Sequence, residues 1–400
     1  VPGFARPVSA WVHSSASART VASDAAMAVQ AALQYPGQIA TLILPADAAW
    51  LEADRAAPAL PKPSPAAVST EAIDQAAAAL GSGGKTMMLI RGAALKERGL
   101  TAAGRLAAAT GARIVCDTFA PRCQRGAGRV EVERIPYFAE QIVEFMKGTE
   151  HLILVGASPP VSFFAYPGKP SWCTPEGCKI LYLAHAHEDG TVALEALADA
   201  VKAPRQPLHV GISSKPDIPN GPLNPQTAGQ VIAHHLPNGA IISDEGATAG
   251  GGVHRYAATI EPHDHLALTG GAIGQGIPVA AGAAVACPDR KVVSLQGDGA
   301  AMYTLQALWT QARESLDVTT VIFANRSYAI LNIELTRVGA GEPGPRAISM
   351  LDLHNPELDW VKLASGMGVE ASRATSVEQF ATQFATAMKH RGPRLIEFVV

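Results

Sequence analysis

Residues 291–328 read KVVSLQGDGAAMYTLQALWTQARESLDVTTVIFANRSY, and this stretch decides the fold. The apolar run 291–296 predicts a strand that leads into a glycine turn. Residues 302–314 carry apolar side chains at the i, i+3, i+4 and i+7 spacing of a helix. Residues 318–324 are rich in β-branched side chains and predict a second, buried strand. The stretch therefore predicts a β-α-β unit whose two strands are parallel.

Two polar residues follow these strands: Asp298 in the glycine turn and Asn325, which lies 27 positions later. Because parallel strands end at the same edge of a sheet, we expect both side chains at the edge where open α/β sheets bind ligands. The N–H groups of a helix start favour phosphate, and carboxylate, amide and phosphate oxygens together suit Mg²⁺. The alternative is a turn without a ligand, in which Asp298 caps the helix and Asn325 ends the strand.

The wider sequence resembles the thiamine diphosphate (ThDP) enzymes related to acetolactate synthase and benzoylformate decarboxylase. Their signature is Gly-Asp-Gly, a spacer of this length, and an asparagine at the end of the next strand. The resemblance extends upstream through TGGAIGQGIP at 269–278, AAGAAVA at 280–286 and PDRK at 288–291. These elements stand in the order and spacing of the family. The spacing of GGAIGQG does not fit the G-x-G-x-x-G fingerprint of dinucleotide-binding proteins.

The resemblance implies a role for individual residues. Asp298 and Asn325 would bind Mg²⁺ through their side chains, and Ser327 would bind it through its backbone carbonyl. The N–H groups of Gly299 and Ala300 would face the diphosphate; many relatives have serine at the second position, so one hydroxyl contact is expected to be missing. The implied cofactor-binding set is Thr248, Gly271, Ala272, Ile273, Gly297, Asp298, Gly299, Ala300, Asn325, Ser327, Tyr328, Ala329 and Ile330.

Within this set, two residues would hold the head of the cofactor. The carbonyl of Gly271 would meet the aminopyrimidine. Ile273 would be an apolar wedge that bends the cofactor and brings its amino group towards the thiazolium carbon. The alternative for Ile273 is ordinary packing of the following helix.

The domain order also follows the family, whose fold is α/β with doubly wound parallel sheets. Residues 1–52 are expected to be the C-terminal remnant of a pyrimidine-binding domain, because one helix (24–34) and one strand (38–45) cannot close a core. Residues 53–69 are a proline-rich linker. Residues 70–202 form a central α/β domain, and residues 203–400 form the domain that binds thiamine diphosphate and Mg²⁺. The family's activating glutamate belongs to the first domain, and residues 1–52 offer no candidate for it.

The resemblance implies a ThDP- and Mg²⁺-dependent decarboxylase or carboligase, acetolactate synthase-like, that acts on a pyruvate-type or aryl 2-oxo acid. A benzoylformate decarboxylase-like lyase is the alternative, although decarboxylases of this group place a histidine in the loop that corresponds to residues 161–166. Here that loop carries Phe163, Phe164 and Tyr166 instead. Their role is either packing or substrate contact, and no catalytic proton donor is assigned. Nothing in the central domain selects FAD.

Composition agrees with a cytoplasmic enzyme. The net charge is −3, which gives no reason to expect nucleic acid or an anionic membrane as a partner. No apolar run approaches membrane length, and the five cysteines lack zinc-site spacing, which favours free thiols in a reducing compartment. The family builds its sites between subunits, so the resemblance implies a homodimer or homotetramer for the full-length protein.

Two other function classes remain open at this point. The run His185-Ala-His187-Glu-Asp189 has part of the ligand pattern of binuclear zinc hydrolases, without the further histidine that those enzymes carry. The other possibility is a binding or regulatory protein that keeps the ThDP-enzyme fold without activity, since the activating glutamate has no candidate here.

Overall fold

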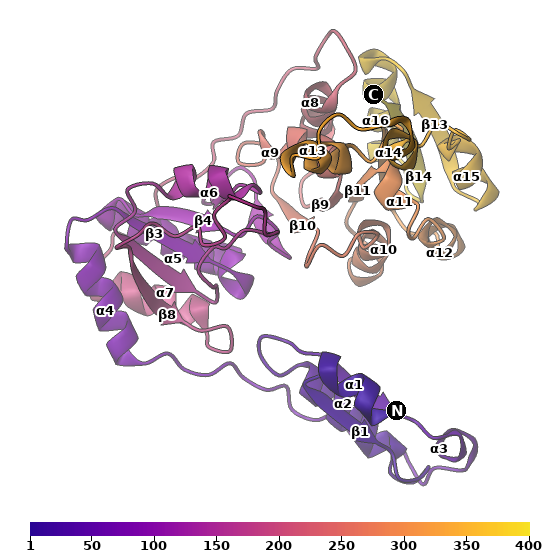
Figure 1. The fold of residues 1–400 in the computed structure, drawn as a ribbon. Helices are drawn as coiled ribbons and strands as arrows, with labels where there is room; N and C mark the ends of the chain where they lie inside the picture. Colours follow the sequence, from indigo (N-terminus) through magenta and orange to yellow (C-terminus); the bar gives the residue numbers. More distant parts are fainter.

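A computed structural model describes residues 1–400 and shows three separate β-sheets along the chain (Figure 1). Two larger units lie beside each other, and a small N-terminal unit lies apart from both of them at the end of an extended segment. The α/β architecture with parallel sheets that the sequence predicts is confirmed.

The N-terminal unit holds a two-stranded parallel sheet. Strand β1 (Trp11–Ser14) pairs with β2 (Ala40–Ile43), and helix α2 (Val21–Ala32) connects them. The sequence predicted only the second strand, whose four residues stand inside the longer, largely apolar run 38–45, whereas the four residues of β1 do not stand in such a run. The short helices of this unit are α1 (Pro2–Ala5), a 3₁₀ turn (Arg6–Val8) and α3 (Ala46–Trp50). Residues 51–65 contain no helix or strand, as expected for a chain segment with many prolines.

The second unit is a five-stranded parallel sheet in the order β6-β4-β3-β7-β8. Its strands are β3 (Thr86–Ile90), β4 (Arg113–Cys116), β6 (Glu133–Arg134), β7 (His151–Val155) and β8 (Lys179–Ala184). Its helices are α4 (Thr70–Gly81), α5 (Glu97–Thr110), α6 (Ala139–Met146) and α7 (Gly190–Ala200), with a 3₁₀ turn at Gly92–Leu95. Side chains of β3 alternate between two cores: Met88 and Ile90 pack with α4, α5 and α7, whereas Met87 and Leu89 pack with α6.

The third unit is a seven-stranded sheet in the order β13-β14-β12-β11-β9-β10-β5. Its strands in chain order after β5 are β9 (Ile241–Glu245), β10 (His263–Ala267), β11 (Val292–Gly297), β12 (Val318–Ala324), β13 (Glu370–Ala374) and β14 (Arg394–Val399). One face packs against α8 (Pro225–His235), α9 (Ala247–His254) and α16 (Val377–Lys389). The other face packs against α10 (Gly276–Ala286), α12 (Ala307–Arg313) and α15 (Trp360–Gly366).

One strand crosses the predicted boundary between the larger units. Strand β5 (Cys123–Arg125) belongs by sequence to residues 70–202, yet it pairs antiparallel with β10 of the third unit. Arg122, directly before it, makes an ion pair with Asp264 of β10, with 2.7 Å between Nε and Oδ1. The division at residue 202 therefore does not describe which residues build which sheet. A three-residue strand paired with a partner about 140 positions away carries no local signal.

The helix predicted over residues 302–314 is wrong at its start. The chain forms a short helix α11 (Asp298–Ala301), turns, and begins α12 only at Ala307. The turn is held because the hydroxyl of Thr304 donates to the carbonyl of Gly274, 2.6 Å away. Leu308 is fully buried, but Trp309 is 53% exposed, so the apolar spacing overstated the buried face.

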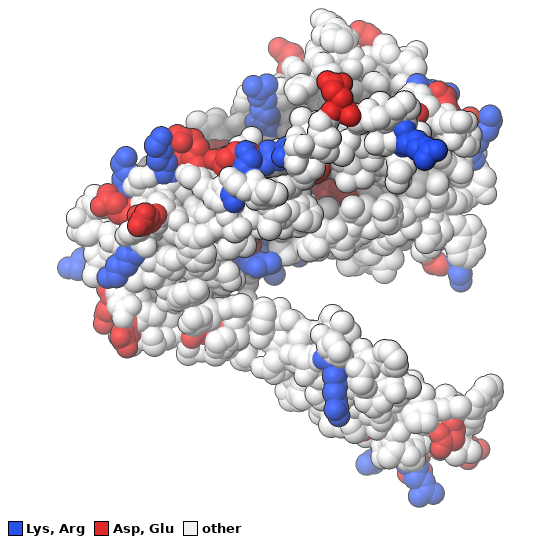
Figure 2. Space-filling model, viewed as in Figure 1, with Lys and Arg blue, Asp and Glu red and all other residues white.

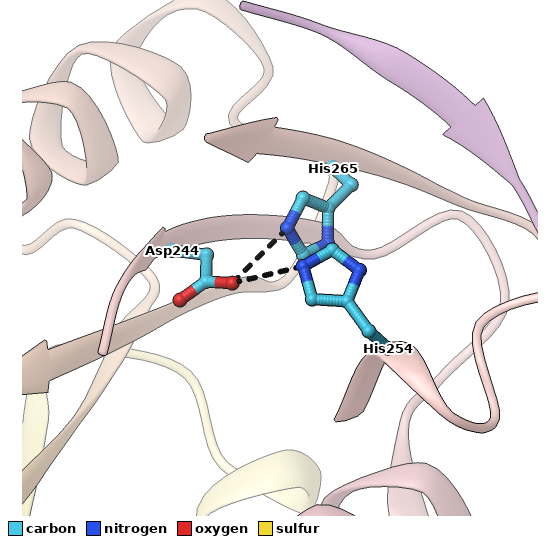
Figure 3. Close-up of side chains that lie close together, drawn as sticks. All are labelled: Asp244, His254 and His265. Carbon is cyan, nitrogen blue, oxygen red and sulfur yellow. Dashed lines mark ion pairs between the residues drawn. The ribbon is translucent and has the colours of Figure 1, made fainter. Parts of the chain in front are cut away.

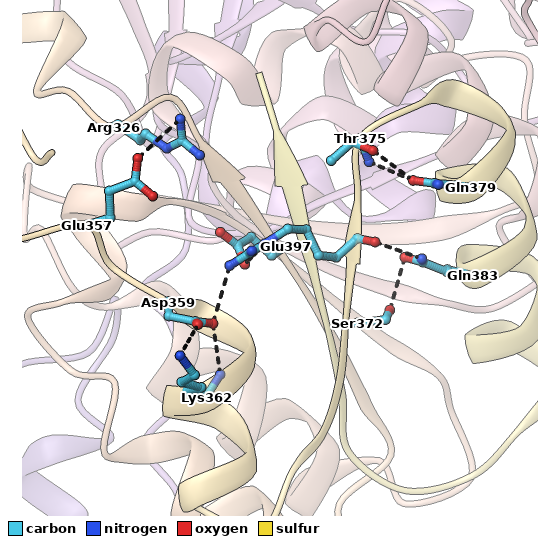
Figure 4. Close-up of polar contacts among 10 residues, drawn as sticks. Arg326, Glu357, Asp359, Lys362, Ser372, Thr375, Gln379, Gln383 and Glu397 are labelled. Atoms are coloured by element: carbon cyan, nitrogen blue, oxygen red, sulfur yellow. Dashed lines mark hydrogen bonds and ion pairs between the residues drawn. The ribbon is translucent and has the colours of Figure 1, made fainter.

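Ionic contacts tie α15 to the edge of the same sheet (Figure 4). The carboxylate of Asp359 accepts from the N–H of Lys362 at the start of the helix, 3.1 Å away, and caps it. Arg373 on β13 bridges Asp359 and the buried Glu397 of β14, with contacts of 3.2 and 2.8 Å. These contacts stabilise this edge of the sheet, and none of the predicted site residues takes part in them.

Charged side chains are scattered over the molecule. Figure 2 shows Lys, Arg, Asp and Glu mixed on the viewed face, with wide uncharged areas between them. No helix combines the length and the apolar character that crossing a membrane requires.

Candidate functional site

Asp298 lies at the carboxyl end of β11 and begins α11. Its side chain is 3% exposed. One carboxylate oxygen accepts from the N–H of Gly299 at 2.8 Å, and the other accepts from the N–H of Arg326 at 2.6 Å. Burial raises the pKa of this carboxyl, and the N–H groups of Arg326 and Gly299 oppose the rise. The second contact joins the ends of β11 and β12, so Asp298 and the segment after β12 lie together, as the β-α-β pattern predicts.

The segment after β12 is a tight loop. Asn325 accepts from the N–H of Ser327 through its side-chain oxygen, 3.0 Å away, and Arg326 between them has a left-handed φ of 56°. Residues 326–328 are also hydrogen-bonded to the end of helix α14 (Pro345–Leu351) and to the residues after it: the N–H of Tyr328 donates to the carbonyl of Leu351, and the N–H of Leu353 donates to the carbonyl of Arg326, both at 2.9 Å. Asn325 and Ser327 are therefore held in fixed positions beside Asp298.

Gly299 lies where the two loops come closest. A Cβ placed on this glycine would stand 2.5 Å from the ring of Tyr328, which is closer than any side chain tolerates. The tight turn at 297–299 therefore depends on a glycine at this position, and Ala300 follows on the half-buried side of α11. Ala329 and Ile330 begin helix α13 (Ala329–Arg337) and are half-buried.

The loop 269–275 carries Gly271, Ala272 and Ile273 and contacts the turn after α11 through Gly274. It is fastened by Glu245, a buried residue at the end of β9 that the sequence did not single out. The two oxygens of Glu245 accept from the N–H groups of Gly274 and Gly276, 2.5 and 2.6 Å away. Ala272 is exposed and Ile273 is 52% exposed, so the packing alternative for Ile273 is not supported.

Thr248 is the predicted site residue that the structure connects least to the others. It is exposed in the first turn of α9, after Ala247, whose φ of 46° is unusual for a residue with a side chain. Its hydroxyl makes no hydrogen bond within the chain. Its position at the end of β9 places it at the same sheet edge as Asp298, because β9 and β11 are paired in parallel.

The aromatic loop 161–166 of the second unit reaches this edge. Phe163 lies 3.2 Å from the position that a Cβ on Gly271 would occupy. Its ring packs against Phe119 and Tyr137, with centroids 5.5 and 5.6 Å apart, yet Phe163 is still 44% exposed and Phe164 is 51% exposed. The loop is therefore compatible with both predicted roles, packing and substrate contact, since one side of it packs and the other side remains open beside Gly271.

A polar network joins the same loop to α13. The hydroxyl of Tyr166 donates to the carboxylate of Glu334, and burial, followed by that contact, raises the pKa of Tyr166 to about 12. Arg337 lies over the ring of Phe138, 4.0 Å from its centroid, and makes two hydrogen bonds of 2.9 and 3.0 Å to Glu140. These contacts were not predicted, because they join residues about 170–200 positions apart. They fix α13 and the aromatic loop relative to each other.

The residues at this edge fit a hydrated divalent cation with a diphosphate. The carboxylate of Asp298 is buried without a cationic side chain in hydrogen-bond contact, and burial raises its pKa, which is the state that a bound cation relieves. The amide oxygen of Asn325 and the carbonyl of Ser327 complete the hard oxygen donors that Mg²⁺ prefers. The glycines at 271 and 299 allow the rings of Phe163 and Tyr328 to lie close to the backbone of this edge.

The hydrolase alternative is not supported. Asp189 accepts from the N–H groups of Thr191 and Val192, both 3.1 Å away, and caps helix α7. The rings of His185 and His187 are stacked on the surface with their planes 10° apart. The run is therefore a helix start with exposed histidines.

Comparisons with known proteins point to one family. Residues 248–398 match the family model described as "Thiamine pyrophosphate enzyme, C-terminal TPP binding domain". The whole chain is 49% identical over 403 aligned positions to a Mycobacterium tuberculosis protein provisionally named acetolactate synthase large subunit IlvX, of which it covers 77%. Over 52% of the chain it is also 32% identical to benzoylformate decarboxylase of Pseudomonas aeruginosa, covering 39% of that protein.

Solved structures share the fold. The ThDP-dependent 4-hydroxybenzoylformate decarboxylase of Rhodococcus jostii RHA1 superposes with a TM-score of 0.81 at 24% sequence identity. The superposition covers 100% of the present chain and 77% of that protein. A Mycobacterium smegmatis protein provisionally described as a thiamin diphosphate-dependent enzyme gives a TM-score of 0.79 with the same coverage. At these identities the likeness concerns the fold.

Proposed function

Because this chain belongs to the family of thiamine diphosphate-dependent enzymes, we propose that it serves the Mg²⁺-dependent decarboxylation of a 2-oxo acid, with or without transfer to a second carbonyl compound. Acetolactate synthase-like carboligation and decarboxylation of the benzoylformate type are the two forms of this reaction. Family membership alone does not include the Mg²⁺ ion or the 2-oxo acid substrate, and both are part of this proposal.

The observation that carries the proposal is the meeting of Asp298 with the loop 325–327. The hydrogen bond of 2.6 Å from the N–H of Arg326 to Asp298 joins the two strand ends. In the proposed site Asp298, Asn325 and the carbonyl of Ser327 hold Mg²⁺, which in turn holds the diphosphate. The neighbouring N–H groups of residues 299 and 300 complete the anion-binding edge.

When bound, thiamine diphosphate would supply a nucleophilic carbon and would accept the electron pair that the breaking C–C bond leaves behind as CO₂ departs. The residues of this chain position it. Gly271 lies in a loop that Glu245 fixes in place, and its carbonyl accepts from the N–H of Ile273, 2.9 Å away. Ile273 is an exposed apolar side chain in the same loop, as a wedge under a bent cofactor must be.

We place the substrate side chain beside the aromatic loop. Phe163 and Phe164 leave about half of their surface open next to Gly271. Leu331 and Ile333 of α13 are 47% and 40% exposed. An apolar environment of this kind suits an aryl or small aliphatic 2-oxo acid. Tyr166 and Glu334 provide the only hydrogen-bonded phenol–carboxylate pair that joins the aromatic loop to α13.

We further propose that the protein works as a homo-oligomer. Large apolar side chains stand exposed on α10 and α12 and before α12: Val285, Tyr303 and Trp309 are 64%, 59% and 53% exposed. Helices α10 and α12 lie on the lower side of the third unit in Figure 1, and Figure 2 shows few charged side chains on that side. A monomer rarely leaves such a surface uncovered. Light scattering after gel filtration tests this, and a monomer at all concentrations contradicts it.

The test of the cofactor assignment is calorimetric titration of the protein with thiamine diphosphate. We expect binding when Mg²⁺ is present and little or none after chelation. Release of CO₂ from pyruvate and from benzoylformate is then compared in the same preparation. Binding without any dependence on a divalent cation contradicts the role of Asp298. Because residues 1–52 offer no candidate for the activating glutamate, we expect negligible release of CO₂ from either acid by these 400 residues, and clear release contradicts that expectation.

A further inference from the structure

Three side chains that the proposed function does not use converge beside the site. Asp244 comes from β9, His254 from the last turn of α9, and His265 from β10 (Figure 3). One oxygen of Asp244 faces the Nε2 atoms of both histidines, 3.3 Å from His254 and 3.2 Å from His265. Each residue offers one ligand atom, and the three atoms lie within 4.8 Å of one another.

The spacing fits a tetrahedral metal ion better than it fits hydrogen bonds. With metal–ligand distances of about 2.0–2.1 Å, two ligands of a tetrahedral Zn²⁺ stand about 3.3–3.4 Å apart. The two distances from Asp244 have this length. They are long for a charge-assisted hydrogen bond, which spans about 2.7–2.9 Å. Gly250 leaves the space for the carboxylate, because a Cβ there would stand 2.5 Å from its other oxygen.

Both ring nitrogens of His265 lack hydrogen-bond partners. His265 is 3% exposed, and neither of its ring nitrogens makes a hydrogen bond. Such a group costs free energy when it is buried, unless an ion or a water molecule satisfies it. This observation is independent of the spacing, and it points to a missing ligand at the same place.

Arg134 of β6 occupies part of the same space. Its guanidinium lies 2.8 Å from Nε2 of His254. Since arginine can only donate, this nitrogen of His254 is the acceptor, and its one lone pair points at the guanidinium. It therefore gives no proton to the carboxylate of Asp244, 3.3 Å away. The guanidinium supplies positive charge beside both groups, in competition with a metal ion.

We propose that Asp244, His254 and His265 form a binding site for a single Zn²⁺ ion, separate from the Mg²⁺ site at Asp298. Two nitrogens and one oxygen are donors that Zn²⁺ accepts in sites with three protein ligands and one water. The ion would join α9 to β9 and β10, and it would displace Arg134 from His254. Its first effect is to fix α9, the helix that carries Thr248.

The test is equilibrium dialysis of the chelator-treated 400-residue protein against Zn²⁺, with millimolar Mg²⁺ present throughout. We expect one Zn²⁺ per chain. Asp244→Asn and His254→Ala should each weaken binding by more than about 100-fold, beyond the range for loss of a residue that only supports a ligand. Arg134→Met should strengthen it. A His185→Ala/His187→Ala double variant is the matched control for surface histidines and should keep the stoichiometry.

Co²⁺ provides a readout that does not depend on how well the variants fold. Wild-type protein with one equivalent of Co²⁺ should show the intense visible absorption of a four-coordinate site, and Zn²⁺ should abolish it. Less than one-tenth of a Zn²⁺ per chain overturns the proposal. Zinc that survives Asp244→Asn but is lost in the His185/His187 variant also overturns it, since the ion then lies on the surface.

Discussion

Replacing Asp298 with asparagine separates the two roles that the site assigns to this residue. The change keeps the size of the side chain and one acceptor oxygen, but it removes the charge and turns an NH₂ group towards one of two N–H donors at 2.6 and 2.8 Å. Loss of one charged hydrogen bond costs about 1.5–3 kcal/mol. Burial raises the pKa of Asp298, which means that the charged carboxylate is destabilised in the folded protein. Replacing it with a neutral amide removes this cost and therefore stabilises the fold.

The free energy of unfolding of the ligand-free protein should therefore change little, by about 1–2 kcal/mol in either direction. The effect of ligand should change far more. A ligand present at about 100 times its Kd stabilises the folded state by about 2.7 kcal/mol. For a unit of roughly 200 residues this corresponds to a rise in Tm of roughly 5–10 °C. Wild-type protein should show this rise with Mg²⁺ and thiamine diphosphate together, and Asp298→Asn should not.

The assay is thermal unfolding followed by circular dichroism, with and without Mg²⁺ and thiamine diphosphate. Asp359→Asn is the matched control, because Asp359 also accepts a backbone N–H at a helix start but lies outside the site. This variant should keep the full rise in Tm. An equal rise in Asp298→Asn and wild type refutes the assignment of Asp298 as a metal ligand.

Three further predictions concern packing and reactivity. Arg337→Met removes the two hydrogen bonds to Glu140 and the charge over the ring of Phe138. It should lower the free energy of unfolding by about 1–2 kcal/mol. It should also increase proteolysis of the loop 161–172, as measured by mass spectrometry. Trp360→Ala empties a fully buried position and should lower the urea unfolding free energy by about 3–5 kcal/mol, whereas Trp50→Ala, at an 85% exposed position, should change it by less than about 0.5 kcal/mol. Burial raises the pKa of Cys116 to about 12, so native protein at pH 8 should leave this thiol unalkylated while urea-unfolded protein reacts, and labelling of native Cys116 would contradict its burial.

The β-α-β unit and the edge of the sheet were predictable because their signals are local. Strand β12 has the predicted bounds of 318–324, and β11 begins and ends within one residue of the predicted run. The parallel connection then places Asp298 and Asn325 at one edge. The start of α12 was not predictable, because the contact of Thr304 with Gly274 competes with the helical spacing of the same residues.

The contribution of Glu245 had only a weak local signal. It stands at the end of a short apolar strand beside Asp244, a place where polar residues are common at sheet edges. Its two hydrogen bonds reach about 30 positions along the chain to the loop that carries Gly271. Sequence spacing gives no indication of which of the two acidic residues points to which face of the sheet.

The sequence by itself determined the fold class, the family and the residues at the carboxyl ends of β11 and β12, because periodicity and crossover handedness act within about forty residues. Only the tertiary structure decided the recruitment of β5 into the third sheet, the approach of Phe163 to Gly271, and the meeting of Asp244, His254 and His265. These depend on how separate elements pack. Packing brings distant residues together through shape and burial, which leave no regular pattern in the order of the residues.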